Sequence, residues 1–303
     1  MSRALVVGYG ALGSRLAKAL ERDHEVVTVD VRASESQTTR HHTADLRDSQ
    51  HIQRLVQGLS PDLVFYTAGI SAAGCDEDPA LGRQLHVAAP SVILRSMTAG
   101  RFVYISSFAV YGFDRTSSPN EDCQTDPRGI YATLKAEAES TLLSYATSTD
   151  VWVIRPCGLY GDSQGVGSLS QRYLRNRILQ LDSGVVKVPP PATNLDEFMH
   201  YDNAAQICAA IGRRRRRATP HGRVLNVGTG VRSTGKDLTC ALRNLRPDLI
   251  EEIELPPNGF GSTAALDVSR MKRLTRTRPM SLTEGLAQMR TDVSRAVSTS
   301  GGR

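Results

Sequence analysis

The first half of the chain alternates short apolar runs with longer stretches of helical spacing, and this alternation constrains the fold most. The apolar runs are rich in Val, Ile, Leu and Phe and span 4–7, 25–30, 63–67, 102–106 and 151–155. Stretches with the apolar spacing of helices lie between them, at 12–22, 49–59, 79–98 and 130–147. Strands that are apolar along their whole length are typical of a parallel sheet that helices cover on both faces. We therefore predict an α/β fold with a doubly wound parallel sheet.

This alternation ends near residue 160. Three consecutive prolines at 189–191 exclude both a helix and a central strand there. Regular apolar spacing returns at 201–211 and 224–227. We therefore expect a first domain and a smaller C-terminal lobe, with residues 1–160 and 198–230 in the domain and residues 161–197 and 231–303 in the lobe.

The positive charge of the chain does not by itself indicate a nucleic-acid partner. The formal net charge is +6, but five arginines stand in one block at 213–217, which is typical of a solvated loop or helix end. Aromatic residues make up only 5% of the chain, and no basic groove with interleaved aromatic side chains is predicted. We expect no nucleic-acid partner.

Other features of the composition indicate a cytoplasmic protein. The first strand-like run begins at residue 4, which leaves no room for a signal peptide. No apolar run approaches the ~20 residues of a membrane span, so no membrane contact is expected. The five cysteines are scattered, with no Cys-x-x-Cys pair, and we predict no metal site.

A glycine-rich turn follows the first apolar run. The stretch Gly8-Tyr-Gly10-Ala-Leu-Gly13 stands between a predicted strand and a predicted helix, which is the context of a dinucleotide-binding turn. Gly8 permits the tight turn, Gly10 lets a pyrophosphate approach the backbone, and Gly13 lets the helix pack closely on the strand. Ala11 and Leu12 begin that helix, whose N-terminus would face the phosphates. We predict that these five residues bind a dinucleotide.

Asp30 ends the second apolar run and is predicted to select the cofactor. An acidic residue at this place accepts hydrogen bonds from the ribose hydroxyl groups of the adenosine. Its carboxylate would repel a 2′-phosphate, which favours NAD over NADP, although Arg32 and Arg40 stand close by.

Two later segments are further candidates for cofactor contact. Asp45 and Leu46 follow a short run that could form the third strand, and they are candidates for contact with the adenine. Ala68 and Gly69 end the run at 63–67, and their small size lets the backbone pass close to a cofactor.

The candidate catalytic residues are Ser107, Tyr131 and Lys135. Tyr131 and Lys135 stand four residues apart in a predicted helix and therefore share one face. A tyrosine with its ordinary pKa of about 10 is a poor base at neutral pH. A lysine ammonium and a positively charged nicotinamide would both stabilise the phenolate and lower that pKa. Ser107, at the end of a predicted strand, could hydrogen-bond a substrate oxygen and hold it against the phenol.

With these motifs in this order, the chain resembles the extended short-chain dehydrogenase/reductases, the NAD-dependent epimerase/dehydratase family, over residues 3–230. The resemblance rests on the glycine-rich turn, Ser106-Ser-Phe-Ala-Val-Tyr-Gly112, Tyr131-x-x-x-Lys135, Arg155-Pro-Cys-Gly-Leu-Tyr-Gly161, Phe198-Met-His-Tyr-Asp202 and Leu225-Asn-Val-Gly-Thr-Gly230. It implies a Rossmann sheet with bound NAD, a Ser–Tyr–Lys centre and a smaller lobe that closes over the substrate. It also implies that Pro156 lies near the nicotinamide, and we count Tyr131 and Lys135 among the cofactor-binding candidates as well. A homodimer is implied to form through two long helices, here 79–98 and 130–147.

Departures from the family's pattern narrow the chemistry. Phe108 and Ala109 stand where the family's 4,6-dehydratases carry acidic residues, and neither can move a proton. A dehydration of that type is therefore not expected. Gly158 stands where sugar-nucleotide members have an asparagine that contacts the substrate. Asp196, followed by Glu197, replaces an arginine that binds the diphosphate, and a carboxylate there would repel a phosphate.

Other residues of the chain could replace the missing contacts. Arg172, Arg175 or Arg177 could bind a phosphate from the predicted helix at 169–181, the alternative being a solvated helix face. We count Gly158, Arg172 and Arg175 among the substrate-binding candidates, with Ser107 and Tyr131. His86 stands where many relatives have an asparagine, and we expect it to be a core or interface residue.

Three functions are compatible with this sequence. The first is an NAD-dependent, epimerase-like enzyme that transfers a hydride reversibly at a hydroxyl carbon of a small-molecule substrate. As the substrate we favour a sugar nucleotide only slightly over a free or differently activated sugar, cyclitol or other polyol. The second is a net reductase or dehydrogenase with the same centre. The third is a cofactor-sensing regulatory protein without catalysis, although such relatives usually lack the Tyr131 and Lys135 pair.

Overall fold

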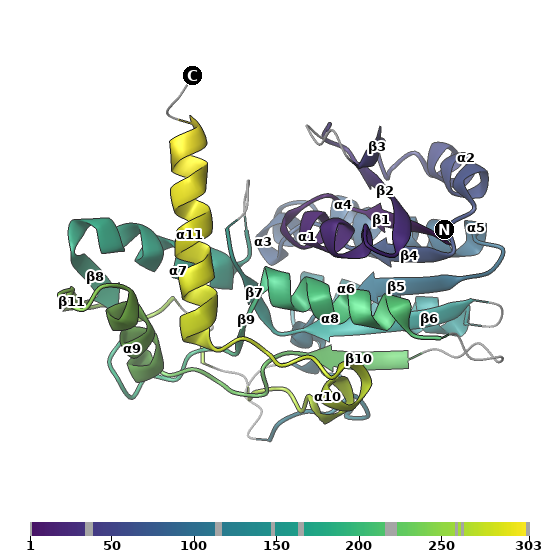
Figure 1. Cartoon of the computed structure of the whole chain (residues 1–303). Coiled ribbons are helices and arrows are strands. Elements are labelled where there is room, and N and C mark those ends of the chain that lie inside the picture. Colours follow the sequence, from purple (N-terminus) through teal and green to yellow (C-terminus); the bar gives the residue numbers. More distant parts are fainter. Residues whose placement is uncertain are drawn as a thin grey trace.

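The protein is built around one parallel sheet. The computed structural model describes residues 2–33, 39–112, 117–146, 149–162, 167–215, 223–257, 260–261 and 264–300. Seven strands form the sheet in the order β10-β6-β5-β4-β1-β2-β3, and every neighbouring pair is parallel (Figure 1). They are β1 Ser2–Val7, β2 His24–Asp30, β3 Arg40–Thr43, β4 Leu63–Tyr66, β5 Arg101–Ile105, β6 Asp150–Pro156 and β10 Arg223–Val227. The predicted doubly wound α/β fold is confirmed.

Helices cover both faces of this sheet. One face is covered by α1 (Ala11–Leu20) and α8 (Tyr201–Arg213), whose side chains pack with alternate residues of the strands. The other face is covered by α2 (Ser49–Leu59), α5 (Ala89–Ser96) and α6 (Ile130–Ser144). Both sides of each central strand are therefore buried, which is why these strands are apolar along their whole length.

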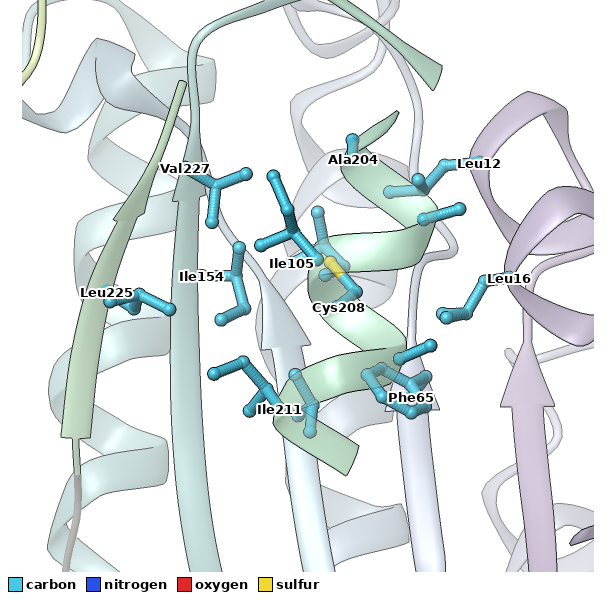
Figure 2. Close-up of a cluster of buried hydrophobic side chains, with 14 of the residues drawn as sticks. Leu12, Leu16, Phe65, Ile105, Ile154, Ala204, Cys208, Ile211, Leu225 and Val227 are labelled. Carbon is cyan, nitrogen blue, oxygen red and sulfur yellow. The ribbon is translucent and has the colours of Figure 1, made fainter. Parts of the chain in front are cut away.

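The first of these two packed layers is drawn in Figure 2. Leu12 and Leu16 of α1 lie against one side of α8, whose Cys208 is enclosed between α1 and the sheet. Ile154 and Leu225, from β6 and β10, close the cluster on the other side. This layer fixes α1, and with it the glycine-rich turn that precedes α1.

The helical stretch predicted at 79–98 is interrupted by a π-helical turn. It consists of α4 (Pro79–Arg83), a π-helical turn η1 (Gln84–Ala88) and α5, and a short helix α3 (Ala72–Glu77) precedes it. Tyrosine hydroxyl groups from the sheet donate hydrogen bonds to carbonyls of this turn. Tyr66 donates to the Leu85 oxygen at 2.5 Å and Tyr104 to the His86 oxygen at 3.0 Å. The sheet therefore stabilises the π turn directly.

Most elements after residue 157 pack into a third cluster of buried residues. Besides α8 and β10, the elements of this part of the chain are β7 Gly158–Tyr160, α7 Leu169–Gln180, η3 Leu181–Ser183, β8 Val185–Val188, β9 Phe198–His200, α9 Gly235–Leu245, β11 Ile250–Ile253, α10 Ser269–Thr275 and α11 Leu282–Ser300. Strands β7 and β9 pair in parallel, as do β8 and β11. Side chains of α7, α9 and α11 pack together in this cluster, whereas Met271 of α10 packs against the main sheet. The division of the chain into a domain and a lobe remains a prediction.

No helix in the described part of the chain is long and apolar enough to cross a membrane.

Candidate active site

Two glycines of the turn after β1 are required by close backbone packing. Gly8 has a φ of +94°, and a methyl group added to it would lie 2.5 Å from the backbone nitrogen of Ala68. A methyl group added to Gly13 would overlap the carbonyl oxygen of Gly8. Both positions therefore exclude a side chain, as predicted for a tight turn and for close packing of helix and strand.

Gly10 differs from its two neighbours because the space beside it is open. A methyl group added to Gly10 would meet no atom within 4 Å. Gly10 is also the N-cap of α1, and no side chain caps the helix there. The first N–H groups of a helix, here those of Ala11, Leu12 and Gly13, have no partner within the helix and bind anions well. This open, uncapped helix end fits the pyrophosphate of a dinucleotide.

Asp30 lies beside the turn at the end of β2, and its carboxylate already has partners. It accepts hydrogen bonds from the backbone nitrogens of Tyr9, at 2.7 Å, and Arg32, at 3.0 Å. The guanidinium group of Arg32 also donates to it at 3.3 Å. Burial raises the pKa of Asp30, but the hydrogen bonds from Arg32 and Tyr9 outweigh burial and hold it below its ordinary value. Asp30 is therefore ionised at neutral pH.

The other cofactor candidates lie at neighbouring strand ends. Asp45 binds the side chain of Arg47, with a shortest distance of 2.6 Å, and Leu46 is buried in the core. Ala68 lies against Gly8, and a methyl group added to Gly69 would overlap the ring of His86. Pro156 ends β6, beside Val227 of β10. Contact of these residues with a cofactor remains a prediction.

The structure brings the three candidate catalytic residues together at the carboxyl end of β5. Ser107 follows β5 and accepts a hydrogen bond from the Ala109 backbone nitrogen at 3.2 Å. Ser107 also forms a hydrogen bond with the phenol of Tyr131. The Nζ atom of Lys135 donates to the carbonyl oxygen of Ile105 at 2.7 Å and lies 5.7 Å from the ring centroid of Tyr131.

Burial has the largest effect on the pKa values of Tyr131 and Lys135. Burial raises the pKa of Tyr131 to about 12, although the hydrogen bond with Ser107 lowers it. Burial also lowers the pKa of Lys135 to about 7, against the opposing effect of the Glu139 charge. Lys135 is therefore only partly charged at neutral pH, and its ammonium group donates to Ile105. The lowering of the Tyr131 pKa by a charged Lys135 together with a bound nicotinamide remains a prediction.

Sequence analysis missed Glu139, which lies on the same helix face. The residue is buried, accepts a hydrogen bond from Ser106 at 2.5 Å and forms an ion pair with Arg155, also at 2.5 Å. A signal was present, since Glu139 follows Lys135 by four residues, as Lys135 follows Tyr131.

His86 is a core residue beside this centre, as expected. Its Nε2 atom lies 3.1 Å from the Ile70 carbonyl oxygen, and its ring contacts the ring of Tyr131 edge-on. Burial, with a smaller effect of the Lys135 charge, lowers the pKa of His86 to about 3. The imidazole is therefore neutral at physiological pH.

The two acidic residues at 196 and 197 serve the packing of loops. One carboxylate oxygen of Glu197 accepts from the Gly230 nitrogen and the other from the Leu266 nitrogen, both at 2.7 Å. Asp196 accepts from the Gly261 nitrogen at 3.0 Å and is close to Arg232. Burial raises the pKa of both carboxyl groups. These bonds account for two acidic residues in the interior.

The remaining substrate candidates have different environments. A methyl group added to Gly158 would lie 2.6 Å from the Ser170 hydroxyl oxygen, so packing alone requires a glycine there. Arg172 is exposed, and Arg175 binds Asp162 at 3.2 Å.

Arg177 is buried, which contradicts the alternative of a solvated helix face. Its guanidinium carbon lies 3.9 Å from the centroid of the Tyr173 ring, and it forms an ion pair with Glu254 at 2.7 Å. Arg177 therefore stabilises the packing of α7 against its neighbours.

A group of potential metal ligands lies near the start of α8. One ligand atom from each of His200, Asp202 and Asp292 lies within 4.8 Å of the others. Arg15 lies among these groups, with its Nε atom 2.7 Å from Asp202 and its Nη2 atom 3.8 Å from Asp292. A guanidinium group thus already provides the positive charge there.

Comparisons with known proteins agree with this geometry. Residues 4–228 match the model of a family described as the NAD dependent epimerase/dehydratase family. A dTDP-glucose 4,6-dehydratase of Streptomyces griseus is 30% identical over 192 residues, which cover 61% of this chain and 56% of the relative. A D-erythronate dehydrogenase of Haemophilus influenzae is 26% identical over 159 residues, which cover 48% of this chain and 50% of the relative. The chain thus spans about half the length of the curated relatives it matches.

Solved structures share the fold over almost the whole chain. A UDP-glucose 4-epimerase of Thermotoga maritima, crystallised with UDP-glucose, has a TM-score of 0.81 at 20% identity and covers 97% of this chain and 99% of its own. A UDP-glucose 4-epimerase of Thermus thermophilus, in complex with NAD, has a TM-score of 0.79 at 22% identity and covers 95% of this chain and 98% of its own.

Proposed function

The chain belongs to the NAD-dependent epimerase/dehydratase family, and from this premise we propose that it is an epimerase-like enzyme that transfers a hydride reversibly at a hydroxyl carbon of a sugar or sugar nucleotide. The observation that carries the proposal is the meeting of Ser107, Tyr131 and Lys135 at the carboxyl end of β5. In sheets of this kind, ligands bind at the carboxyl ends of the strands. The glycine-rich turn ends β1 at the same edge of the sheet.

NAD would be held by residues at the carboxyl ends of β1, β2, β4 and β6. The N–H groups at the start of α1 would bind its pyrophosphate, and Asp30 would accept hydrogen bonds from its adenosine ribose. Ala68, Gly69 and Pro156 would line the path to the nicotinamide. The chemistry that bound NAD would supply is reversible hydride transfer at the substrate carbon.

The protein's own residues would handle the proton. The Ser107 hydroxyl would bind the substrate oxygen and orient its proton toward Tyr131. Tyr131 would take that proton as a phenolate and return it when the hydroxyl group is restored. A charged Lys135 close to the phenol would favour the phenolate, since an opposite charge stabilises the ionised form.

The chemistry of the residues after Ser107 supports epimerisation over dehydration. Loss of water would require a proton donor there, and the next two residues are Phe108 and Ala109. They begin the short helix η2 (Phe108–Tyr111), in which the Ala109 nitrogen is bonded to Ser107. Neither side chain can carry a proton.

The test is the substitution Tyr131→Phe. We expect it to abolish turnover of an identified substrate, with thermal stability unchanged, because only the phenol hydroxyl is lost. Retained NAD and no net NADH absorbance during turnover would support an epimerase. Unchanged turnover in the variant would refute the proposal.

A net dehydrogenase is the second candidate, favoured by the likeness to a D-erythronate dehydrogenase. It would use the same centre but exchange the cofactor at each turnover. Formation or consumption of NADH in proportion to product would identify it. A regulatory protein without catalysis is less well supported, because Ser107, Tyr131 and Lys135 stand in one cluster.

The finer expectations on assembly and setting also belong to this proposal. We propose a homodimer formed through the run α4–η1–α5 and α6, whose surfaces are joined by the ion pair of Arg83 with Glu137 at 2.5 Å. Size-exclusion chromatography with light scattering would test it. Five free cysteines support a reducing, cytoplasmic setting.

A further inference from the structure

Three chemically distinct residues share one buried face of α6. Tyr131, Lys135 and Glu139 follow one another at intervals of four residues, which places them one turn apart. Lys135 and Glu139 are each only 4% exposed. A buried carboxylate therefore lies one helical turn from a buried amine, on the side away from Tyr131.

The carboxylate of Glu139 is held by partners other than Lys135. Its two oxygens accept from the Nε atom of Arg155, both at 3.1 Å, and one accepts from Nη2 at 2.5 Å. The hydroxyl group of Ser106 donates to it at 2.5 Å. The amine of Lys135 donates to the Ile105 carbonyl at 2.7 Å. Glu139 therefore acts on Lys135 through its charge.

Arg155 is anchored independently of Glu139. Its Nη1 atom donates to the hydroxyl oxygen of Tyr111 at 2.8 Å, and Tyr111 in turn donates to Asn226 at 2.7 Å. Asn226 donates to the Pro119 carbonyl at 2.9 Å. This chain of bonds crosses from β6 to β10, so the guanidinium group has a fixed place beneath α6.

The other groups that face Lys135 are neutral at physiological pH. They are Tyr104 of β5, Tyr131 of α6, Cys75 of α3 and His86 of η1. Burial raises the pKa of the first three and lowers that of His86. Of the groups found to act on Lys135 in the described part of the chain, Glu139 is the one with a negative charge.

We propose that Glu139 is a positioning residue of the reaction centre, held by Arg155 and Ser106 so that its charge favours the ammonium form of Lys135. The inference rests on the proposed roles of Tyr131 and Lys135. The supporting shift is that burial lowers the pKa of Lys135 to about 7, whereas the Glu139 charge raises it. Without Glu139, the amine would be mostly neutral at physiological pH and could no longer stabilise a phenolate.

The test is a titration of Lys135 in the ligand-free protein, which requires no turnover. The chain has five lysines, so protein labelled with lysine that carries ¹³C at Cε gives few NMR signals. Lys135→Met identifies the signal of Lys135 by its loss. In Glu139→Gln, we expect the titration midpoint of Lys135 to fall by roughly one pH unit or more, as for loss of an opposite charge nearby.

Two further variants separate this effect from general damage. Glu137→Gln removes a carboxylate from the same helix, but one that pairs with Arg83 on the surface, and it should leave the Lys135 midpoint unchanged. The double variant Glu139→Gln/Arg155→Met removes both charges of the buried ion pair. It preserves the fold in case an unpaired Arg155 destabilises the single variant. Its midpoint should lie between those of the wild type and Glu139→Gln.

An unchanged Lys135 midpoint in a folded Glu139→Gln variant, or in the double variant, would overturn the inference. In an active enzyme, the alkaline limb of the kcat/KM profile should move to lower pH together with the NMR midpoint. If the Lys135 midpoint shifts but the protein turns over no sugar, the effect of Glu139 on Lys135 is supported and only the proposed function is refuted.

Discussion

The imidazole ring of His86 stands edge-on to the phenol ring of Tyr131, with 5.4 Å between the ring centroids and 88° between the planes. Gly69 lies on another side of this imidazole, close enough that an added methyl group would overlap the ring. His86 therefore forms part of the wall against which Tyr131 packs.

We expect His86 to make folding stability depend on pH. Burial lowers the pKa of His86 to about 3, below its ordinary value of 6.5. Between these values the unfolded chain binds more protons than the native state. Stability should therefore fall as the pH falls through this window, by up to about 1.4 kcal/mol per pH unit.

Urea unfolding of His86→Gln measures this contribution. A glutamine can still donate to the Ile70 carbonyl but cannot be protonated, so the decline in stability between about pH 6 and 4 should become shallower. The same decline in both proteins would show that His86 is not responsible for it.

Substitution by alanine should lower folding stability at Gly13 and NAD affinity at Gly10. Gly13→Ala places a methyl group on the Gly8 carbonyl and should cost more than about 2 kcal/mol of folding stability. Gly10→Ala meets no atom of the protein and should change stability by less than about 0.5 kcal/mol. It should nevertheless weaken NAD binding by roughly tenfold or more, because the methyl group would fill the space expected for the pyrophosphate.

Thermal unfolding and calorimetric titration with NAD distinguish these outcomes. If the Gly10→Ala variant binds NAD as tightly as the wild type, the pyrophosphate does not bind at the open end of α1.

Asp30→Ala should weaken NAD more than NADP, because it removes both an acceptor for the ribose hydroxyls and a charge that repels a 2′-phosphate. Asp30→Asn is the matched control, since its amide oxygen can still accept from the Tyr9 nitrogen and preserve the turn. Dissociation constants for both cofactors provide the measurement. An unchanged ratio of the two constants in Asp30→Ala would rule out this role for Asp30.

Two arginines of α7 should separate substrate binding from stability. Arg172 is exposed and donates to the Gly167 carbonyl at 2.9 Å, so Arg172→Ala should leave the fold intact and raise KM if this residue binds a substrate phosphate. Arg177 is buried, and Arg177→Ala would remove one of the two basic partners of Glu254, the other being Lys187, and would uncover Tyr173. We expect a loss of about 1–3 kcal/mol of stability, mainly from the lost packing on Tyr173, measured by urea unfolding.

An unchanged KM in Arg172→Ala would show that Arg172 does not bind the substrate. A stable Arg177→Ala protein would contradict the structural role of that residue.

The sequence alone was sufficient for features that depend on local backbone geometry and regular spacing. Apolar runs on both faces of the strands predicted the doubly wound sheet, because helices bury both of its sides. The glycine spacing predicted the turn after β1, because tight turns and close packing exclude side chains at fixed places. Tyr131 and Lys135 were found by their separation of four residues on a helix.

Only the tertiary structure decided the electrostatic state of the centre. Glu139 and Arg155 are 16 residues apart, and their pairing depends on where α6 lies against β6. The pKa values of the Lys135 amine and of the Tyr131 phenol depend most on burial among residues from β5, α3 and η1. Asp196 and Glu197 likewise bind loops that follow in the chain by more than 30 residues. Charge states depend on desolvation and on partners distant in sequence, and the order of residues in the chain specifies neither until the fold has formed.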